Sequence, residues 1–123
     1  MSHECIVGIG SNIDPEHNFA AALYSLRDEH QVLAVSSKVI TSPIGIIEQA
    51  DFLNGAVKVS TQMDKYEFEH YLKDLEDRLK RDRNAPKFGP RTIDLDIIVW
   101  EGIVVDDDYY ERDFLKLVVD EIS

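Results

Sequence analysis

Two hydrophobic periodicities alternate along the chain, and their order constrains the fold more than any other feature. Apolar residues recur at helical spacing over residues 15–27 and again over 64–79. Segments rich in β-branched residues, or alternating apolar with polar residues, predict strands at 6–9, 32–40, 52–60 and 92–100. This βαββαβ order predicts an α+β fold, a ferredoxin-like antiparallel sheet with both helices packed on one face. A short C-terminal helix is predicted within 109–122.

Local signals place the starts of the two main helices. Asp14 is a favourable N-cap residue and is followed by Pro15, which suits the first helical position. Asp64 and Glu67 have the spacing of a capping box. The second helix is the clearest in the sequence.

Length and charge limit the classes of protein that this chain can represent. With 123 residues and 44% hydrophobic content, it suits a single domain over residues 1–123. It has no run of about 18 apolar residues and no secretory-signal pattern at its start, so we expect a cytoplasmic protein without membrane contact. A net charge of −11 disfavours nucleic-acid binding. The sequence leaves the oligomeric state open.

The strand predicted at 92–100 carries two carboxylates at positions i and i+2. Side chains at this spacing point to the same face of a strand, so Asp94 and Asp96 are expected side by side. Such a pair suits Mg²⁺, which takes one or two protein carboxylates and completes its shell with water and substrate phosphates. The alternative is an edge strand whose carboxylates face water.

Basic residues gather immediately before this strand. Residues 78–91 contain six of the 13 Lys and Arg residues of the chain. Some of them suit a helix C-terminus, where cations favour the negative end of the helix dipole. Arg81, Arg83 and Arg91, however, approach the carboxylate pair in sequence, and forked guanidinium groups suit phosphate. Cations, carboxylates and a Gly-Pro turn together indicate phosphoryl transfer.

Several motifs resemble one family in order and spacing. The run Gly89-Pro90-Arg91-Thr92-Ile93-Asp94-Leu95-Asp96 resembles the signature of 6-hydroxymethyl-7,8-dihydropterin pyrophosphokinases. Segments that agree with it are Gly8-Ile9-Gly10-Ser11-Asn12, Gln49-x-Asp51-Phe52-Leu53-Asn54 and Arg81-x-Arg83. The resemblance extends over roughly residues 5–100, which is more than a chance motif produces.

The resemblance implies a reaction and a set of residues for it. ATP would transfer its terminal diphosphate to the hydroxymethyl group of the pterin, with release of AMP, in folate biosynthesis. Asp94 and Asp96 would bind two Mg²⁺ ions, and Arg81 and Arg91 would act in catalysis. The residues implied for pterin binding are Thr41, Ile44, Phe52, Asn54 and Phe114. Those implied for nucleotide binding are Glu76, Arg83, Ile97 and Arg112.

The sequence departs from the family pattern after residue 100. Residues 100–110 are short and acidic where the family carries ATP contacts, and the resemblance implies a longer C-terminal region than the sequence given. Like charges at 106–108 would oppose the nucleotide. An alternative is therefore a non-catalytic or altered-substrate pterin-binding protein that has lost efficient ATP use. An RNA-binding α+β domain is disfavoured by the acidic charge.

Overall fold

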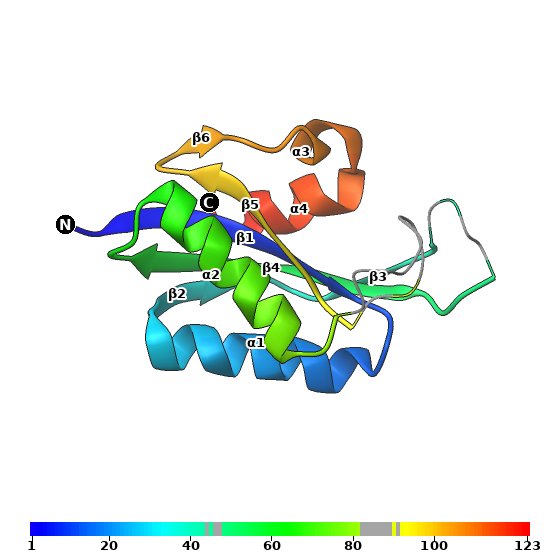
Figure 1. The fold of residues 1–123 in the computed structure, drawn as a ribbon. Helices are drawn as coiled ribbons and strands as arrows, with labels where there is room; N and C mark the ends of the chain where they lie inside the picture. Colours follow the sequence, from blue (N-terminus) through cyan, green and yellow to red (C-terminus); the bar gives the residue numbers. More distant parts are fainter. Residues whose placement is uncertain (44, 46–47, 82–89, 91) are drawn as a thin grey trace.

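The computed structural model describes residues 1–43, 45, 48–81, 90 and 92–123, and their strands form one antiparallel sheet (Figure 1). The strands are β1 (His3–Ser11), β2 (Gln31–Val35), β3 (Val39–Thr41), β4 (Phe52–Thr61), β5 (Asp94–Trp100) and β6 (Ile103–Val104). Their order is β2-β4-β1-β5-β6, and β3 pairs with β4 beyond β2. The predicted α+β class and the βαββαβ order are confirmed.

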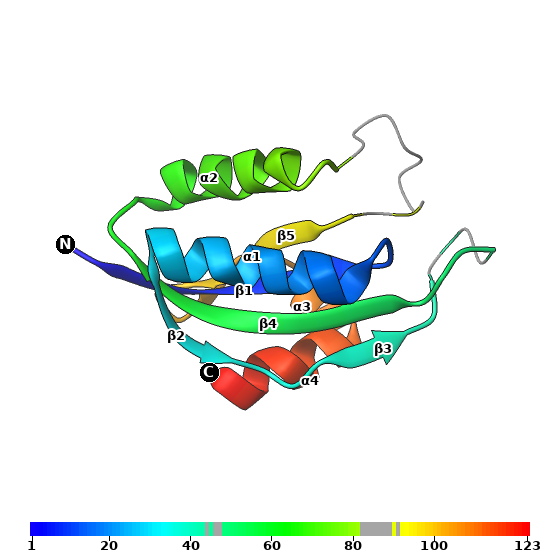
Figure 2. The same ribbon diagram turned by 90° about the horizontal axis from the view of Figure 1, so that it is seen from below.

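Helices cover both faces of the sheet (Figure 2). They are α1 (Pro15–Glu29), α2 (Lys65–Arg78), α3 (Asp108–Glu111) and α4 (Asp113–Ile122). The first two pack on one face, as predicted, around fully buried Phe19 and Phe68. Helix α4 packs on the opposite face, where Leu115 and Val118 contact a second cluster with Ile6 and Ile98. The sheet is thus the middle layer of three.

The predicted strand at 32–40 is divided into two strands at Ser36. The Ser36 hydroxyl accepts the amide hydrogen of Ala56 at 2.8 Å and donates to the Ser37 carbonyl, also at 2.8 Å. The Ser36 side chain therefore accepts a hydrogen bond from β4 that a backbone carbonyl would otherwise accept. Strands β2 and β3 both pair with β4 on either side of this break.

The end of β5 corrects the predicted alternation. Val7 pairs with Ile97 and Ile6 pairs with Val99, so Ile98 is an extra residue in β5, as in a β-bulge. A one-residue slip moves the following side chains to the other face. Regular alternation along the predicted strand at 92–100 would place Val99 on the face of Ile97, but Val99 packs against the cluster on the α4 side.

The helix starts differ in how they are capped. Both hydrogen bonds of the predicted capping box are present, from Glu67 N to Asp64 Oδ1 at 2.8 Å and from Asp64 N to Glu67 Oε1 at 3.0 Å. Asp14 is the N-cap residue of α1 and Pro15 follows it, as predicted, but the Asp14 backbone is in the left-handed region (φ 44°) and its side chain makes no cap hydrogen bond. The predicted C-terminal helix is two helices, separated by extended Arg112. Within the described residues, every helix falls short of the length and apolarity needed to cross a bilayer.

Candidate active site

Residues far apart in the sequence meet on one cavity of about 620 Å³. It lies over β1, β4 and β5 on the side of the sheet that carries α3 and α4. Eight of the residues predicted for function line it: Thr41, Phe52, Asn54, Arg81, Asp94, Asp96, Arg112 and Phe114. Side chains predicted for pterin, for metal and for phosphate therefore share one enclosure.

Two glycines of β1 form the floor between the two halves of this cavity. Gly10 pairs with Asn54 of β4 on one side and with Asp94 of β5 on the other. Gly8 pairs with Asp96 one row further along the strand. A Cβ atom on Gly10 would lie 3.2 Å from Asn54 Oδ1. The missing side chain of Gly10 leaves space beside the amide, whereas a Cβ atom on Gly8 would lie 3.2 Å from Leu115 Cδ1 and 3.3 Å from Ile98 Cγ1.

A chain of charged contacts holds the first carboxylate and its arginine in place. Arg81 Nη1 lies 2.9 Å from Asp94 Oδ1 and 2.9 Å from Glu76 Oε1. Glu76 is fully buried, and its Oε2 accepts the amide hydrogen of Leu95 at 2.7 Å. This series of contacts connects the β5 backbone at Leu95 to Glu76 of α2, then to Arg81, and then to Asp94 at the start of β5. Glu76, predicted as a nucleotide contact, does not line the cavity and instead supports Arg81 from behind.

The second carboxylate is surrounded by negative charge. The pKa of Asp96 is raised from its ordinary value of 3.8 to about 7. Burial is the larger cause, and the negative charge of Asp94 is the second. Lys73 lowers the pKa, whereas Glu76 and Asp106 raise it further. Although the Asp96 side chain keeps 43% of its accessible surface, that surface faces the cavity. Two close carboxylates of this kind favour a bound cation.

Uncharged groups line the other half of the cavity. Asn54 is 7% exposed, and its Nδ2 donates to Thr41 Oγ1 at 2.7 Å. Because the amide nitrogen has this partner, the amide oxygen is directed to the Gly10 side. Phe52 from β4 and Phe114 from α4 are half-buried and line the same half. This half is suited to a flat, polar-edged ring.

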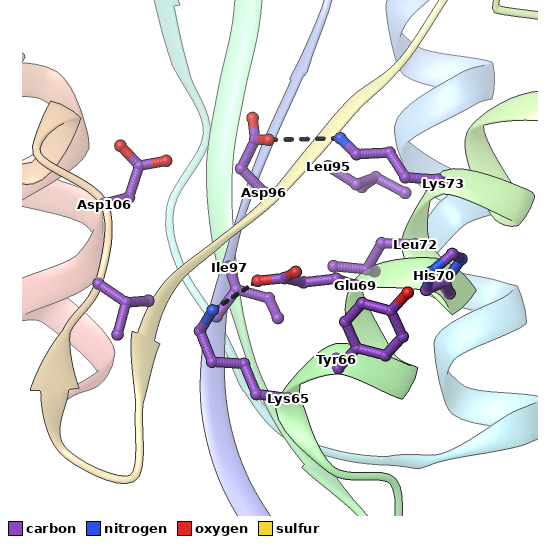
Figure 3. A pocket seen from close by; sticks show the side chains of 11 residues that line it. Lys65, Tyr66, Glu69, His70, Leu72, Lys73, Leu95, Asp96, Ile97 and Asp106 are labelled. Atoms are coloured by element: carbon purple, nitrogen blue, oxygen red, sulfur yellow. Dashed lines mark hydrogen bonds and ion pairs between the residues drawn. The ribbon is translucent and has the colours of Figure 1, made fainter.

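A second, smaller cavity of about 320 Å³ adjoins the first between α2 and β5 (Figure 3). Ile97, predicted as a nucleotide contact, lines this cavity together with Leu72 and Val105. Lys73, Asp96 and Asp106 line both cavities. Arg112 lies at the larger cavity, with its Nε 4.0 Å from Asp108 Oδ1.

Sequence reasoning missed Lys73, and it named Asp106 only as one of the like charges at 106–108 that oppose the nucleotide. Lys73 is one of several charged residues on α2, and only its place three residues before Glu76 hints at a role. Asp106 reaches the site because β5 turns back into β6 through Glu101 and Gly102, which both have positive φ. The predicted residues Ile44, Arg83 and Arg91 lie outside the described residues.

Fold and site together define a small α+β protein with a carboxylate pair facing an aromatic, amide-bearing pocket. Residues 6–123 match the family described as 7,8-dihydro-6-hydroxymethylpterin-pyrophosphokinase (HPPK). The chain belongs to this family, whose members are ATP-using pyrophosphokinases of folate synthesis.

Curated relatives agree with the family assignment. A 2-amino-4-hydroxy-6-hydroxymethyldihydropteridine pyrophosphokinase of Bacillus subtilis is 32% identical over 99% of this chain and 79% of its own length. A protein of the same name from Pseudomonas aeruginosa is 31% identical over 86% of this chain and 67% of its own. A folate synthesis bifunctional protein of Arabidopsis thaliana is 32% identical over 79% of this chain, which spans only 20% of that protein.

Proposed function

We propose that this chain transfers diphosphate from ATP to 6-hydroxymethyl-7,8-dihydropterin, giving AMP and the pterin diphosphate. Family membership supports the reaction class. The observation that carries the proposal is the meeting of Asp94 and Asp96 with Asn54 and Phe52 on one cavity, across the bare glycine floor of β1. Acceptor and donor sites are thereby adjacent, as a direct transfer requires.

The pterin binds on the β4 side of the cavity. Phe52 and Phe114 stack on its ring, because half-buried aromatic faces suit a flat heterocycle. Asn54 accepts a ring N–H through Oδ1, since Thr41 already engages its amide nitrogen. This arrangement discriminates against rings without a donor at that edge, because a buried acceptor would lose its partner. Backbone groups of Thr41 and Ile44 contribute further polar contacts.

The carboxylates on the β5 side fit Mg²⁺. They provide oxygen donors at i and i+2 on one strand face, and burial together with the charge of Asp94 raises the pKa of Asp96. Asp94 and Asp96 would hold two ions, which when bound would offset charge on the ATP phosphates. The fit rests on the chemistry of this donor set.

Arginines stabilise the transferred group. The pterin hydroxymethyl oxygen attacks the β-phosphorus and loses its proton to solvent, while the bond from that phosphorus to the α–β bridging oxygen breaks and AMP leaves with the electron pair. Arg81 is positioned by Glu76 and Asp94 before substrate arrives, so it meets the developing charge without reorganising. Arg112 contacts the phosphates from the α3–α4 junction. The family resemblance assigns the same role to Arg83 and Arg91, which lie outside the described residues.

The nucleotide extends into the smaller cavity. Leu72, Ile97 and Val105 offer apolar walls to the base, and the shared wall at Asp96 leads to the carboxylate pair. Glu76 acts through Arg81 in this arrangement rather than by touching the nucleotide.

A second candidate function is pterin binding without efficient ATP use. It is favoured by Asp106, Asp108 and Glu111, three acidic residues that line the larger cavity and oppose an anionic nucleotide.

One assay separates the two functions. Purified protein is given Mg²⁺, ATP and the reduced hydroxymethylpterin, and AMP is followed over time, with pterin binding measured in parallel by calorimetry. We expect AMP release that requires both Mg²⁺ and pterin. Retained pterin binding with no AMP above background would overturn the kinase and support the second candidate.

A further inference from the structure

Lys73 occupies the junction of the two cavities. It projects from α2 toward β5, and its Nζ lies 3.6 Å from Asp96 Oδ1 and 3.6 Å from Glu76 Oε1 (Figure 3). It shares the junction with Asp96 and Asp106, which are both acidic. Among the residues that line both cavities, Lys73 is thus the cation.

The contact between Lys73 and Asp96 is suited to exchange. A separation of 3.6 Å is longer than the roughly 2.7–2.9 Å of a direct charge-assisted hydrogen bond. The Lys73 side chain is 48% exposed, so solvent can replace its partner at little cost. Glu76 keeps Arg81 at 2.9 Å and the amide of Leu95 at 2.7 Å, so it does not depend on Lys73.

A nucleotide that uses both cavities must carry its phosphates past this lysine. The apolar walls for a base lie in the smaller cavity, and the carboxylate pair lies in the larger one. At the junction, Asp96 and Asp106 repel phosphate, whereas Lys73 attracts it. We propose that Lys73 is a nucleotide-binding residue that exchanges partners, screening Asp96 in the free protein and binding the phosphate chain in the complex. This inference rests on the proposed function and adds a residue to it.

The exchange has two consequences of opposite sign. Without nucleotide, Lys73 competes with any cation for Asp96, so its removal should tighten metal binding. With nucleotide, it contributes a phosphate contact, so its removal should weaken nucleotide binding. A lysine that only supported the fold would weaken both when removed.

The test uses the whole chain with Lys73→Met, which removes the charge and keeps a good helix former, and Lys73→Arg, which keeps the charge. Lys116→Met is the matched control, because Lys116 also lies on a helix, is 52% exposed, pairs with Asp120 at 2.9 Å and lines neither cavity. Mn²⁺ affinity of the nucleotide-free protein is measured by electron paramagnetic resonance. Affinity for α,β-methylene ATP in saturating Mg²⁺ is measured by calorimetry.

We expect Lys73→Met to bind Mn²⁺ roughly three- to tenfold more tightly and the ATP analogue roughly five- to tenfold more weakly. Lys73→Arg should keep the affinity for the analogue within about twofold, and Lys116→Met should leave both affinities within about twofold. Changes of the same sign, or no change, in Lys73→Met would overturn the exchange. If the unsubstituted protein failed to bind the analogue, the proposed kinase function would fall and the exchange with it, a result distinct from one confined to the variants.

Discussion

Strands β4 and β5, which flank Gly10, carry polar side chains that differ in charge and in how firmly they are held. On the β4 side, Asn54 is uncharged and its amide nitrogen already has a partner in Thr41, so this half is fixed before any ligand arrives. On the β5 side, Asp94 forms a 2.9 Å ion pair with Arg81, whereas among the described residues Asp96 has a longer, 3.6 Å contact with Lys73, and its pKa is raised. The β4 side is preorganised to fit a ligand by shape, whereas the β5 side carries negative charge that a bound cation must balance. The difference matches the two substrates of the proposed reaction, an uncharged pterin on the β4 side and a charged ATP on the β5 side.

The largest expected effect removes the unbalanced charge. Asp96→Asn keeps the shape of the side chain but removes one carboxylate of the pair that we propose binds Mg²⁺, so AMP release should fall by about 10²- to 10³-fold. The melting temperature should stay the same or rise, because repulsion from Asp94 is relieved. Asp107→Asn, at an exposed residue that does not line the cavity, is the control. Normal turnover of Asp96→Asn would show that the two halves do not differ as described.

A second change tests whether buried Glu76 holds Arg81 in place on the β5 side. Glu76→Gln keeps an acceptor for the Leu95 amide but weakens the hold on Arg81, so we expect a loss of about 2 kcal/mol in the free energy of unfolding. Glu69→Gln, which removes the exposed pair with Lys65, should cost at most about 0.5 kcal/mol. Urea unfolding measures both. Equal costs would contradict the buried support that we assign to Glu76.

A third change closes the gap between the halves. Gly10→Ala places a methyl group 3.2 Å from Asn54 Oδ1, where it narrows the space for the pterin. Pterin affinity measured by calorimetry should fall about tenfold, equivalent to about 1.4 kcal/mol. Mn²⁺ affinity should change by less than about twofold, because the carboxylates keep their positions. A variant that lost Mn²⁺ binding instead would place the pterin and metal sites differently.

A fourth expected effect is a pH dependence of stability that arises from Asp96. The pKa of Asp96 is raised from 3.8 to about 7 on folding, so its contribution to stability is fully present below pH 3.8 and is lost as the pH rises through 7. In metal-free buffer, unfolding free energy should therefore decline across this window, and Asp96→Asn should flatten the decline. Thermal melts from pH 4 to 8 measure it. An unchanged slope in the variant would assign the effect to another group.

Local patterns in the sequence predicted much of the fold and part of the site. The capping box at Asp64 and the same-face placement of Asp94 and Asp96 followed from spacing alone, because each depends on residues within one element. The need of Asn54 for a partner was also predictable, although the sequence did not indicate Thr41. The sequence could not predict the displacement of Val99, because the bulge at Ile98 arises from pairing with β1.

What the sequence by itself determined is the order of elements, the family and the side-by-side carboxylates. Periodicity and i, i+2 spacing act through a few neighbouring residues, so they can be recognised without a structure. Only the tertiary structure decided that Glu76 supports Arg81 from a buried position and that Lys73 stands where two cavities meet. Both depend on how α2 packs against β5, and such packing joins side chains whose separation in sequence carries no signal of their contact.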